Sequence, residues 1–256
     1  MKIKILGASG AEFPGYNPPA YLINGFILLD AGTLGAVLEE DEQWAIRYII
    51  LSHAHLDHIR AIPFLADNII IKNKKHHITI MAIKDVLRQL KNHLLNGKVW
   101  PDFTVIGRYG PVLRLQEIKP EKEIRINSLL IQPVLVNHSV PAAGYIIKEL
   151  KGKSIISTLI YSGDTGPTDR LWSLAQGADA LIVEVSFPNR LTRLAEETGH
   201  LTPRLLKGEL KKIQALPKKI LITHPKPQYL GLIKKELKTL GIKGLRLLKE
   251  GEEIEI

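Results

Sequence analysis

The sequence contains no cysteine among its 256 residues, which excludes a disulfide framework and a metal site built from thiolates. It has no apolar run as long as a membrane-spanning helix, so no membrane partner is expected. The first residues lack the apolar stretch and cleavage site of a signal peptide, and the cytoplasm is therefore the expected compartment. No linker, low-complexity tract or internal repeat interrupts the chain. We expect one domain over residues 1–256.

What is present is the composition of an ordinary globular protein, with 45% hydrophobic and 24% charged residues. The formal net charge of +9 has two explanations. It fits an anionic substrate or partner, and it fits a solvated, lysine-rich surface equally well. The charge alone does not choose between them.

Apolar runs bounded by turns predict an alternation of strands and helices. The expected strands are at 3–6, 20–23, 26–29, 48–51, 69–71, 78–81, several places between 113 and 136, 145–148, 154–161, 180–185 and, last, 219–223. The expected helices are at 34–42, 59–65, 84–95, 170–176, 202–216 and 229–240. Strands followed by alternating strands and helices in each half indicate an α/β protein.

Three of the nine histidines fall within six residues, directly after the apolar run 48–51. They are His53, His55 and His58, and Asp57 lies among them. Imidazole and carboxylate groups are usual ligands of zinc and related divalent ions. Four donors on one tight loop are too crowded for one tetrahedral ion, so they favour a division between two ions. The alternative is a polar loop with incidental histidines.

Three later strand ends also carry donor residues. His138 follows the run 134–136, Asp164 lies in a turn after Tyr161, and His224 follows the run 221–223. In α/β sheets, ligands gather outside the carboxyl ends of the strands. Each residue alone has an ordinary explanation as a polar strand end or a turn.

Taken together and in this order, these residues resemble the metal-binding motifs of the metallo-β-lactamase superfamily, whose members are mostly hydrolases. The resemblance implies a four-layer αββα sandwich, with two mixed sheets and outer helices. It implies two divalent metal ions, expected to be zinc with manganese or iron as alternatives. The implied ligands are His53, His55 and His138 for one ion, Asp57, His58 and His224 for the other, and Asp164 bridging both.

Asp30 lies where the superfamily has an early aspartate. The resemblance implies that it orients a ligand imidazole or the turn beneath it. The alternative is that Asp30 caps the helix expected to begin near Leu34.

The chemistry of such a site suits phosphodiester hydrolysis. Two divalent ions that share a water molecule lower its pKa and polarise the substrate oxygen, so that a hydroxide between them attacks phosphorus. We count Asp57 with the catalytic residues as well as the ligands. His200 is the candidate general acid and Glu184 its orienting partner. The alternative for His200 is a simple helix start, with Thr202 as the cap and Pro203 as the first helical residue, and both roles can hold.

Three further segments narrow the resemblance to class II 3′,5′-cyclic-nucleotide phosphodiesterases. They are Asn-x-x-x-Trp-Pro at 96–101, Glu-Val-Ser-Phe-Pro-Asn at 184–189 and Gly-His-Leu-Thr-Pro at 199–203. That family hydrolyses cyclic nucleotides, chiefly cyclic AMP, to 5′-nucleotides. The chain departs from it at Arg60-Ala61, where glycine is more usual at the second position, and it is shorter than many members. Trp100 fits a nucleobase-stacking role and a core plug equally well.

Two other functions stay open. A tRNA 3′-processing endonuclease shares the metal set and would use the positive charge to steer phosphates, although no Gly/Pro-rich arm lies between Asp164 and His224. A non-catalytic, metal-dependent nucleic-acid-binding domain is a third interpretation, which the complete ligand set disfavours. A homodimer could form through the helix at 84–95. We assign no role to His76, His77 or His93.

Overall fold

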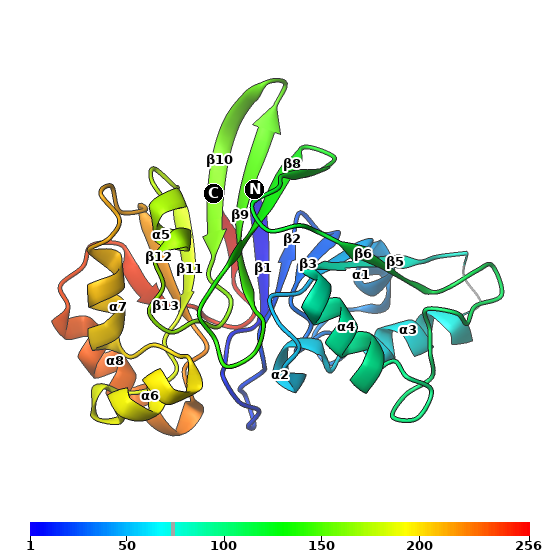
Figure 1. Ribbon diagram of the computed structural model, residues 1–256, viewed down its shortest axis with the longest axis horizontal. Coiled ribbons are helices and arrows are strands. Elements are labelled where there is room, and N and C mark those ends of the chain that lie inside the picture. The colour runs from blue at the N-terminus through cyan, green and yellow to red at the C-terminus, as the bar shows by residue number, and fades with distance from the viewer. Residues whose placement is uncertain (73–74) are drawn as a thin grey trace.

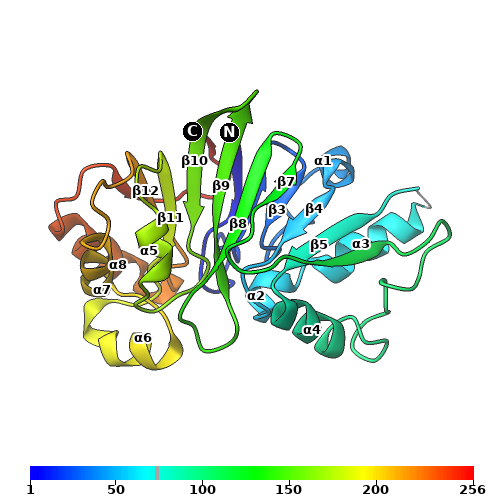
Figure 2. The ribbon, with the colours of Figure 1, turned by 45° about the horizontal axis from the view of Figure 1, so that its top comes forward.

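The computed structural model describes residues 1–72 and 75–256. Residues 73 and 74, part of the basic turn expected before the strand at 78–81, lie outside it. Two seven-stranded sheets face each other, and helices cover their outer sides (Figures 1 and 2). Both sheets mix parallel and antiparallel pairs. The expected αββα sandwich is confirmed.

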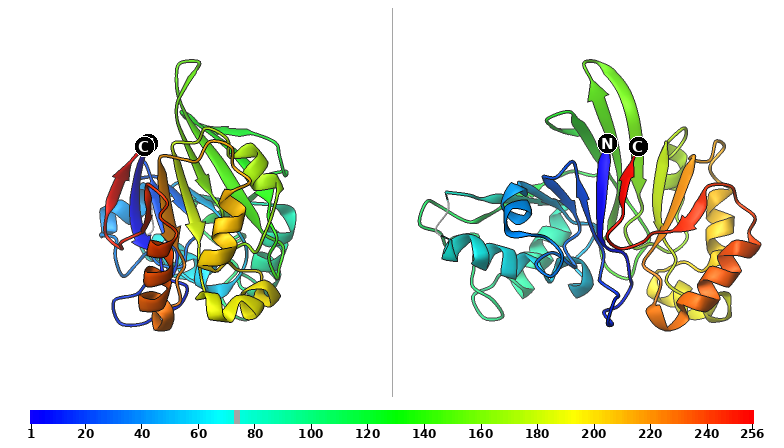
Figure 3. Two further views of the ribbon diagram at one scale, coloured as in Figure 1. Left: turned by 90° about the vertical axis from the view of Figure 1, so that its left-hand side faces the viewer. Right: turned by 180° about the vertical axis from the view of Figure 1, so that it is seen from behind.

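The first sheet is built from the N-terminal part of the chain and the last strand. Its order is β14 (Glu253–Glu255), β1 (Lys2–Gly7), β2 (Ala20–Ile23), β3 (Ile27–Leu29), β4 (Tyr48–Ile50), β5 (Ile78–Ala82) and β6 (Leu113–Glu117). Ile254 of β14 pairs with Ile3 of β1, which brings the two chain ends together (Figure 3). Its helices are α1 (Glu40–Ala45), α2 (Leu56–Ile59), α3 (Ile62–Ile71) and α4 (Lys84–His93).

The second sheet uses the rest of the chain. Its order is β13 (Leu245–Leu247), β12 (Lys219–Thr223), β11 (Ala180–Glu184), β10 (Ser154–Tyr161), β9 (Ala143–Lys151), β8 (Leu129–Leu135) and β7 (Ile124–Ile126). Its helical segments are α5 (Arg170–Leu174), α6 (Thr192–Thr198), α7 (Pro203–Leu210), α8 (Leu230–Thr239) and the short 3-10 turns η1 (Asn189–Leu191) and η2 (Pro227–Tyr229). No helix in the described ranges is long and apolar enough to cross a membrane.

The central strands of the second sheet are buried on both faces. Ile182 and Leu221 point into the core between the sheets, whereas their neighbours Val183 and Ile222 point into a second core beneath the outer helices. Successive side chains of a strand face opposite sides, so a strand covered on both sides needs a continuous apolar run. Ala180–Val183 and Ile220–Ile222 are such apolar runs, so the other sheet packs on one face of these strands and the outer helices pack on the opposite face.

Several expected element boundaries are wrong. The helix expected at 34–42 begins at Glu40, where Glu39 and Glu42 form a capping box, and residues before it form turns. The strand expected at 69–71 is the end of α3, because a short apolar run does not distinguish a buried strand from a buried helix. The helix expected from Thr202 to 216 ends at Leu210, and strands β13 and β14 follow the one expected to be last.

The fold brings the ends of distant strands to one edge. Strands β10, β11 and β12 are parallel to one another, so their carboxyl ends lie side by side. The loop after β4 joins them from the other sheet: the Tyr145 hydroxyl donates to the Leu51 carbonyl at 2.7 Å, and the Ala143 amide donates to the Ser52 carbonyl at 3.0 Å. This edge holds the residues singled out in the sequence.

Candidate metal centre

All seven side chains expected as ligands meet at this edge. The ligand atoms within each group lie within 4.8 Å of one another. The groups include His53, His55 and His138 as one set, Asp57, His58 and His224 as another, and His53, His58 and Asp164 as a third. The structure therefore gathers the residues in the same two halves that the resemblance implies, with Asp164 available to both.

Asp164 lies between the two halves. Its Oδ2 is 3.2 Å from Nε2 of His224, 3.3 Å from Nε2 of His58 and 3.8 Å from Nε2 of His53. On either side, Asp57 Oδ2 is 3.3 Å from Nε2 of His224, and His138 Nε2 is 3.3 Å from Nδ1 of His55. One carboxylate thus borders imidazoles from both halves.

The donor set fits divalent cations. Nε2 of His53 is fully buried and makes no hydrogen bond within the described chain, and neither does Nε2 of His58. A buried polar atom without a partner is costly, and an imidazole lone pair aimed into a cluster of donors is relieved by a metal ion. Five imidazoles and two carboxylates suit zinc, manganese or iron, and no thiolate is needed.

The pKa shifts within the cluster also indicate a site that stabilises positive charge. Burial, and then the neighbouring His58, lower the pKa of His53 well below its usual value. Burial alone would raise the pKa of Asp164, but His224 and His58 outweigh it and hold that pKa well below its usual value. Burial would lower the pKa of His58, yet Asp164 and Asp30 raise it well above normal. The carboxylates therefore stabilise positive charge here, which a proton or a metal ion can supply.

Hydrogen bonds at Nδ1 turn the Nε2 atoms of these histidines toward the cluster. Asp30 Oδ2 accepts from Nδ1 of His58 at 2.8 Å and from the hydroxyls of Ser52 at 2.7 Å and Tyr161 at 2.5 Å. Because the Ser52 hydroxyl donates to Asp30, it can accept from Nδ1 of His53, 3.0 Å away. The Gly199 carbonyl accepts from Nδ1 of His138 at 2.8 Å. Asp30 thus lies behind the candidate ligand imidazoles, and no helix begins at Leu34 for it to cap.

His200 and Glu184 form a buried pair beside the cluster. Nδ1 of His200 donates to Glu184 Oε1 at 2.7 Å, and Glu184 is fully buried. The His200 ring stacks on His224 with centroids 5.5 Å apart and meets His138 edge-on at 5.1 Å. Burial would lower the pKa of His200, but the Glu184 carboxylate raises it above its usual value. Thr202 also caps α7, with Pro203 in its first turn, so the helix-start role holds as well.

Ser186 is a residue that sequence reasoning missed. Its hydroxyl donates to Glu184 Oε2 at 2.9 Å and lies 2.8 Å from Nδ1 of His224, from which it accepts. It therefore links a candidate ligand to the acid pair. Ser186 was quoted within the Glu-Val-Ser-Phe-Pro-Asn segment, but only the folded chain brings it against His224, 38 residues away. Ser52, Tyr161 and Gly199 were missed for the same reason.

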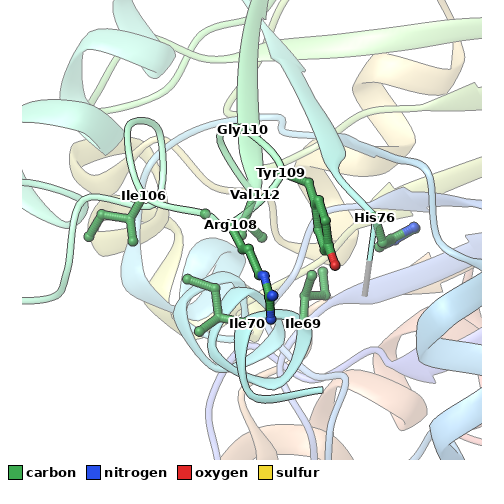
Figure 4. Close-up of a pocket in the computed structure, with 9 residues that line it drawn as sticks. Ile69, Ile70, His76, Ile106, Arg108, Tyr109, Gly110 and Val112 are labelled. Atoms are coloured by element: carbon green, nitrogen blue, oxygen red, sulfur yellow. The ribbon is translucent and has the colours of Figure 1, made fainter. Parts of the chain in front are cut away.

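The remaining histidines lie elsewhere. His77 and His93 are exposed and belong to no group of candidate ligands among the described residues. His76 lines a cavity of about 350 Å³ at the amino-terminal end of β5, the end away from the cluster (Figure 4). There Arg108 lies over the ring of Tyr109, 5.7 Å from its centroid. Trp100 is half-buried against the larger hydrophobic core, and its ring meets that of the exposed Phe64 with centroids 5.3 Å apart.

Known proteins resemble this chain in sequence and in fold. The chain is 29% identical to a probable 3′,5′-cyclic-nucleotide phosphodiesterase of Yersinia pestis over 72% of its own length and 58% of that protein's. It is 24% identical to a ribonuclease Z of Ignicoccus hospitalis over 73% of each chain. The metallo-β-lactamase fold protein YhfI of Bacillus subtilis superposes with a TM-score of 0.77 at 22% identity, covering 99% of both chains. A family model described as the beta-lactamase superfamily domain matches residues 27–224. The chain belongs to the beta-lactamase superfamily.

Proposed function

We propose that this protein is a metal-dependent phosphodiesterase that hydrolyses 3′,5′-cyclic nucleotides, cyclic AMP first among them, to 5′-nucleotides. The observation that carries the proposal is the His200–Glu184 pair, hydrogen-bonded at 2.7 Å, beside the seven candidate ligands. A metal site alone suits many hydrolases. A buried acid next to it suits a reaction whose leaving group is an alkoxide, because an alkoxide needs a proton. The similarity to the Yersinia protein supports the same substrate class.

In this proposal each half of the cluster holds one divalent ion. His53, His55 and His138 hold the first, Asp57, His58 and His224 the second, and Asp164 serves both. When bound, the two ions lower the pKa of water and stabilise negative charge on the phosphoryl oxygens. In the same proposal Asp57, whose side chain is 30% exposed, would accept a proton from the attacking water as well.

His200 supplies the proton for the leaving group. Glu184 accepts from Nδ1 of His200, which leaves Nε2 as the donor. The bond from phosphorus to the 3′ oxygen breaks, and that oxygen takes the proton from Nε2. Glu184 stabilises the imidazolium before transfer and fixes the ring plane. The raised pKa of His200 favours the protonated form that the acid role needs.

A tRNA 3′-processing endonuclease is the second candidate. The similarity to ribonuclease Z and the net charge of +9 favour it. Between Asp164 and His224, however, the chain forms α5, β11, η1, α6, α7 and β12 joined by short loops, and no arm that could grip RNA extends from this part of the described structure. A non-catalytic binding domain is disfavoured by a complete donor set.

A substrate panel tests the proposal. Metal-loaded protein is incubated with cyclic AMP, cyclic GMP, bis(p-nitrophenyl) phosphate and a precursor tRNA, and metal content is measured on the same sample. We expect turnover of the cyclic nucleotides. Cleavage of the precursor alone would favour the endonuclease, and full metal occupancy without turnover would favour the binding domain. Asp164→Ala is expected to lose bound metal and activity together.

A further inference from the structure

A second cavity lies behind the metal centre, between α8, β13 and the loop at 8–16. Its volume is about 760 Å³, within the range of small-molecule sites. Aliphatic side chains form much of its wall, including Leu230, Leu237, Ile242, Leu245 and Leu247. It is lined by none of the seven candidate ligands. The cavity is therefore distinct from the proposed active site.

The rim of this cavity is positively charged. Lys234 and Lys238 lie one helical turn apart on α8, and Lys249 lines it too. No ion pair of these three lysines occurs within the described chain. The one lining carboxylate, Glu250, is already engaged: it accepts from the Ser9 hydroxyl at 3.0 Å and from the Asn17 amide and side chain at 2.8 Å each. An anion would find several cationic partners here.

We propose that this cavity binds an amphipathic anion with an aliphatic chain, such as a fatty carboxylate or an alkyl phosphate. The chain would lie against the leucines while Lys234 and Lys238 hold the charged head. A nucleotide fits less well, because bases stack on aromatic rings and Tyr16 is the one aromatic residue lining the cavity. The proposal does not depend on the substrate of the metal centre.

Residues at the cavity wall also hold the backbone at His224 by hydrogen bonds. The His224 amide donates to the Ala8 carbonyl at 2.7 Å, and the Gly10 amide donates to the Pro225 carbonyl at 3.1 Å. Ala8, Ser9 and Pro225 line the cavity. A bound chain would therefore touch the backbone that holds this candidate ligand in place.

Calorimetric titration with monomeric single-chain amphiphiles tests the proposal. Decanoate, dodecanoate, dodecyl phosphate and dodecyltrimethylammonium are compared below their micellar concentrations. Two further buried methylenes are expected to tighten binding about tenfold from decanoate to dodecanoate. The carboxylate and phosphate arms identify the preferred head. Equal affinity for the cationic amphiphile, no dependence on chain length, or no binding would overturn the proposal.

Charge reversal locates the site. The double variant Lys234→Glu/Lys238→Glu is expected to weaken dodecanoate binding at least about tenfold, by loss of two ionic contacts. Lys235→Glu is the matched control, because Lys235 is exposed on the same helix but does not line the cavity. Ile242→Trp, which places a larger side chain on the cavity wall, should also weaken binding, and Asp164→Ala should retain it. Binding lost in Asp164→Ala but kept in the double variant would assign the anion to the metal centre and refute the proposal.

Discussion

Four imidazoles of the cluster are held by a hydrogen bond at Nδ1, the ring nitrogen that faces away from it. Asp30, Ser186 and the Gly199 carbonyl hold His58, His224 and His138, respectively, and Ser52 holds His53. Such contacts fix the tautomer, so Nε2 carries the lone pair that a metal ion requires. At the scale of single residues, the groups that hydrogen-bond to Nδ1 of the candidate ligands determine whether Nε2 can bind a metal ion.

Removing His200 separates proton donation from metal binding. In His200→Ala we expect kcat on cyclic AMP to fall about 10²–10⁴-fold, because the leaving oxygen loses its proton donor. Metal content should stay at the level of the unmodified protein. His93→Ala is the matched control, since His93 is exposed at the end of α4. Unchanged turnover in His200→Ala would exclude the proposed acid role.

Ser186→Ala tests a residue that positions the candidate ligand His224 through its Nδ1. Loss of its hydroxyl leaves Nδ1 of His224 without its acceptor, so we expect metal affinity to fall about 10–100-fold. Competition with a chromophoric chelator measures this without any substrate. Ser173→Ala, at an exposed position of α5, should bind metal normally. Equal affinity in both variants would show that Ser186 has no positioning role.

At the scale of secondary-structure elements, turns determine where the candidate ligands lie more than strands do. Gly199 ends α6 in the left-handed conformation, with φ of 70°, and its carbonyl faces His138. A Cβ on Gly199 would lie 2.8 Å from Cα of His138 and 2.9 Å from the amide nitrogen of Ser139. The end of this helix and the His138 loop therefore pack too closely for any side chain.

Gly199→Ala should lower the free energy of unfolding more than the same change at another helix end. Gly241 follows α8 with φ of 63° and has open space where a Cβ would stand. In both variants the alanine must adopt the left-handed backbone conformation, which lowers the free energy of unfolding by about 1–2 kcal/mol. Gly199→Ala should lose about 1–3 kcal/mol more through overpacking and should bind metal more weakly. Denaturant unfolding and metal titration measure the two effects. Equal stability of both variants would contradict the close packing.

For the whole molecule, the candidate metal centre joins the two sheets. His53 to His58 come from the loop after β4 of the first sheet, whereas His138, Asp164 and His224 follow strands of the second. Ligands from both sheets mean that bound metal stabilises the sandwich as a whole, because unfolding separates them.

Chelation should therefore lower the melting temperature. Free metal at one hundred times its Kd stabilises by about 2.7 kcal/mol. For a chain of this size that corresponds to a shift of about 5–10 °C. Calorimetry with and without chelator measures it, and Asp164→Ala should show little shift. A melting temperature unaffected by removal of demonstrated metal would show that the ions do not join the sheets.

The sequence by itself determined an α/β protein with donor residues at the ends of runs such as Tyr48–Leu51 and Leu221–Thr223, because these are local signals. The resemblance that those residues carry then implied the family, the αββα sandwich and the seven candidate ligands. It misplaced the start of α1, which the capping box at Glu39 and Glu42 sets, and the end of α3, where a short apolar run fits either a strand or a helix. Only the tertiary structure decided that Ser186 supports His224, that Gly199 supports His138, and that a basic, aliphatic cavity lies behind them. Those contacts join residues far apart in the chain, and strand pairing and packing set their distances, which no local pattern encodes.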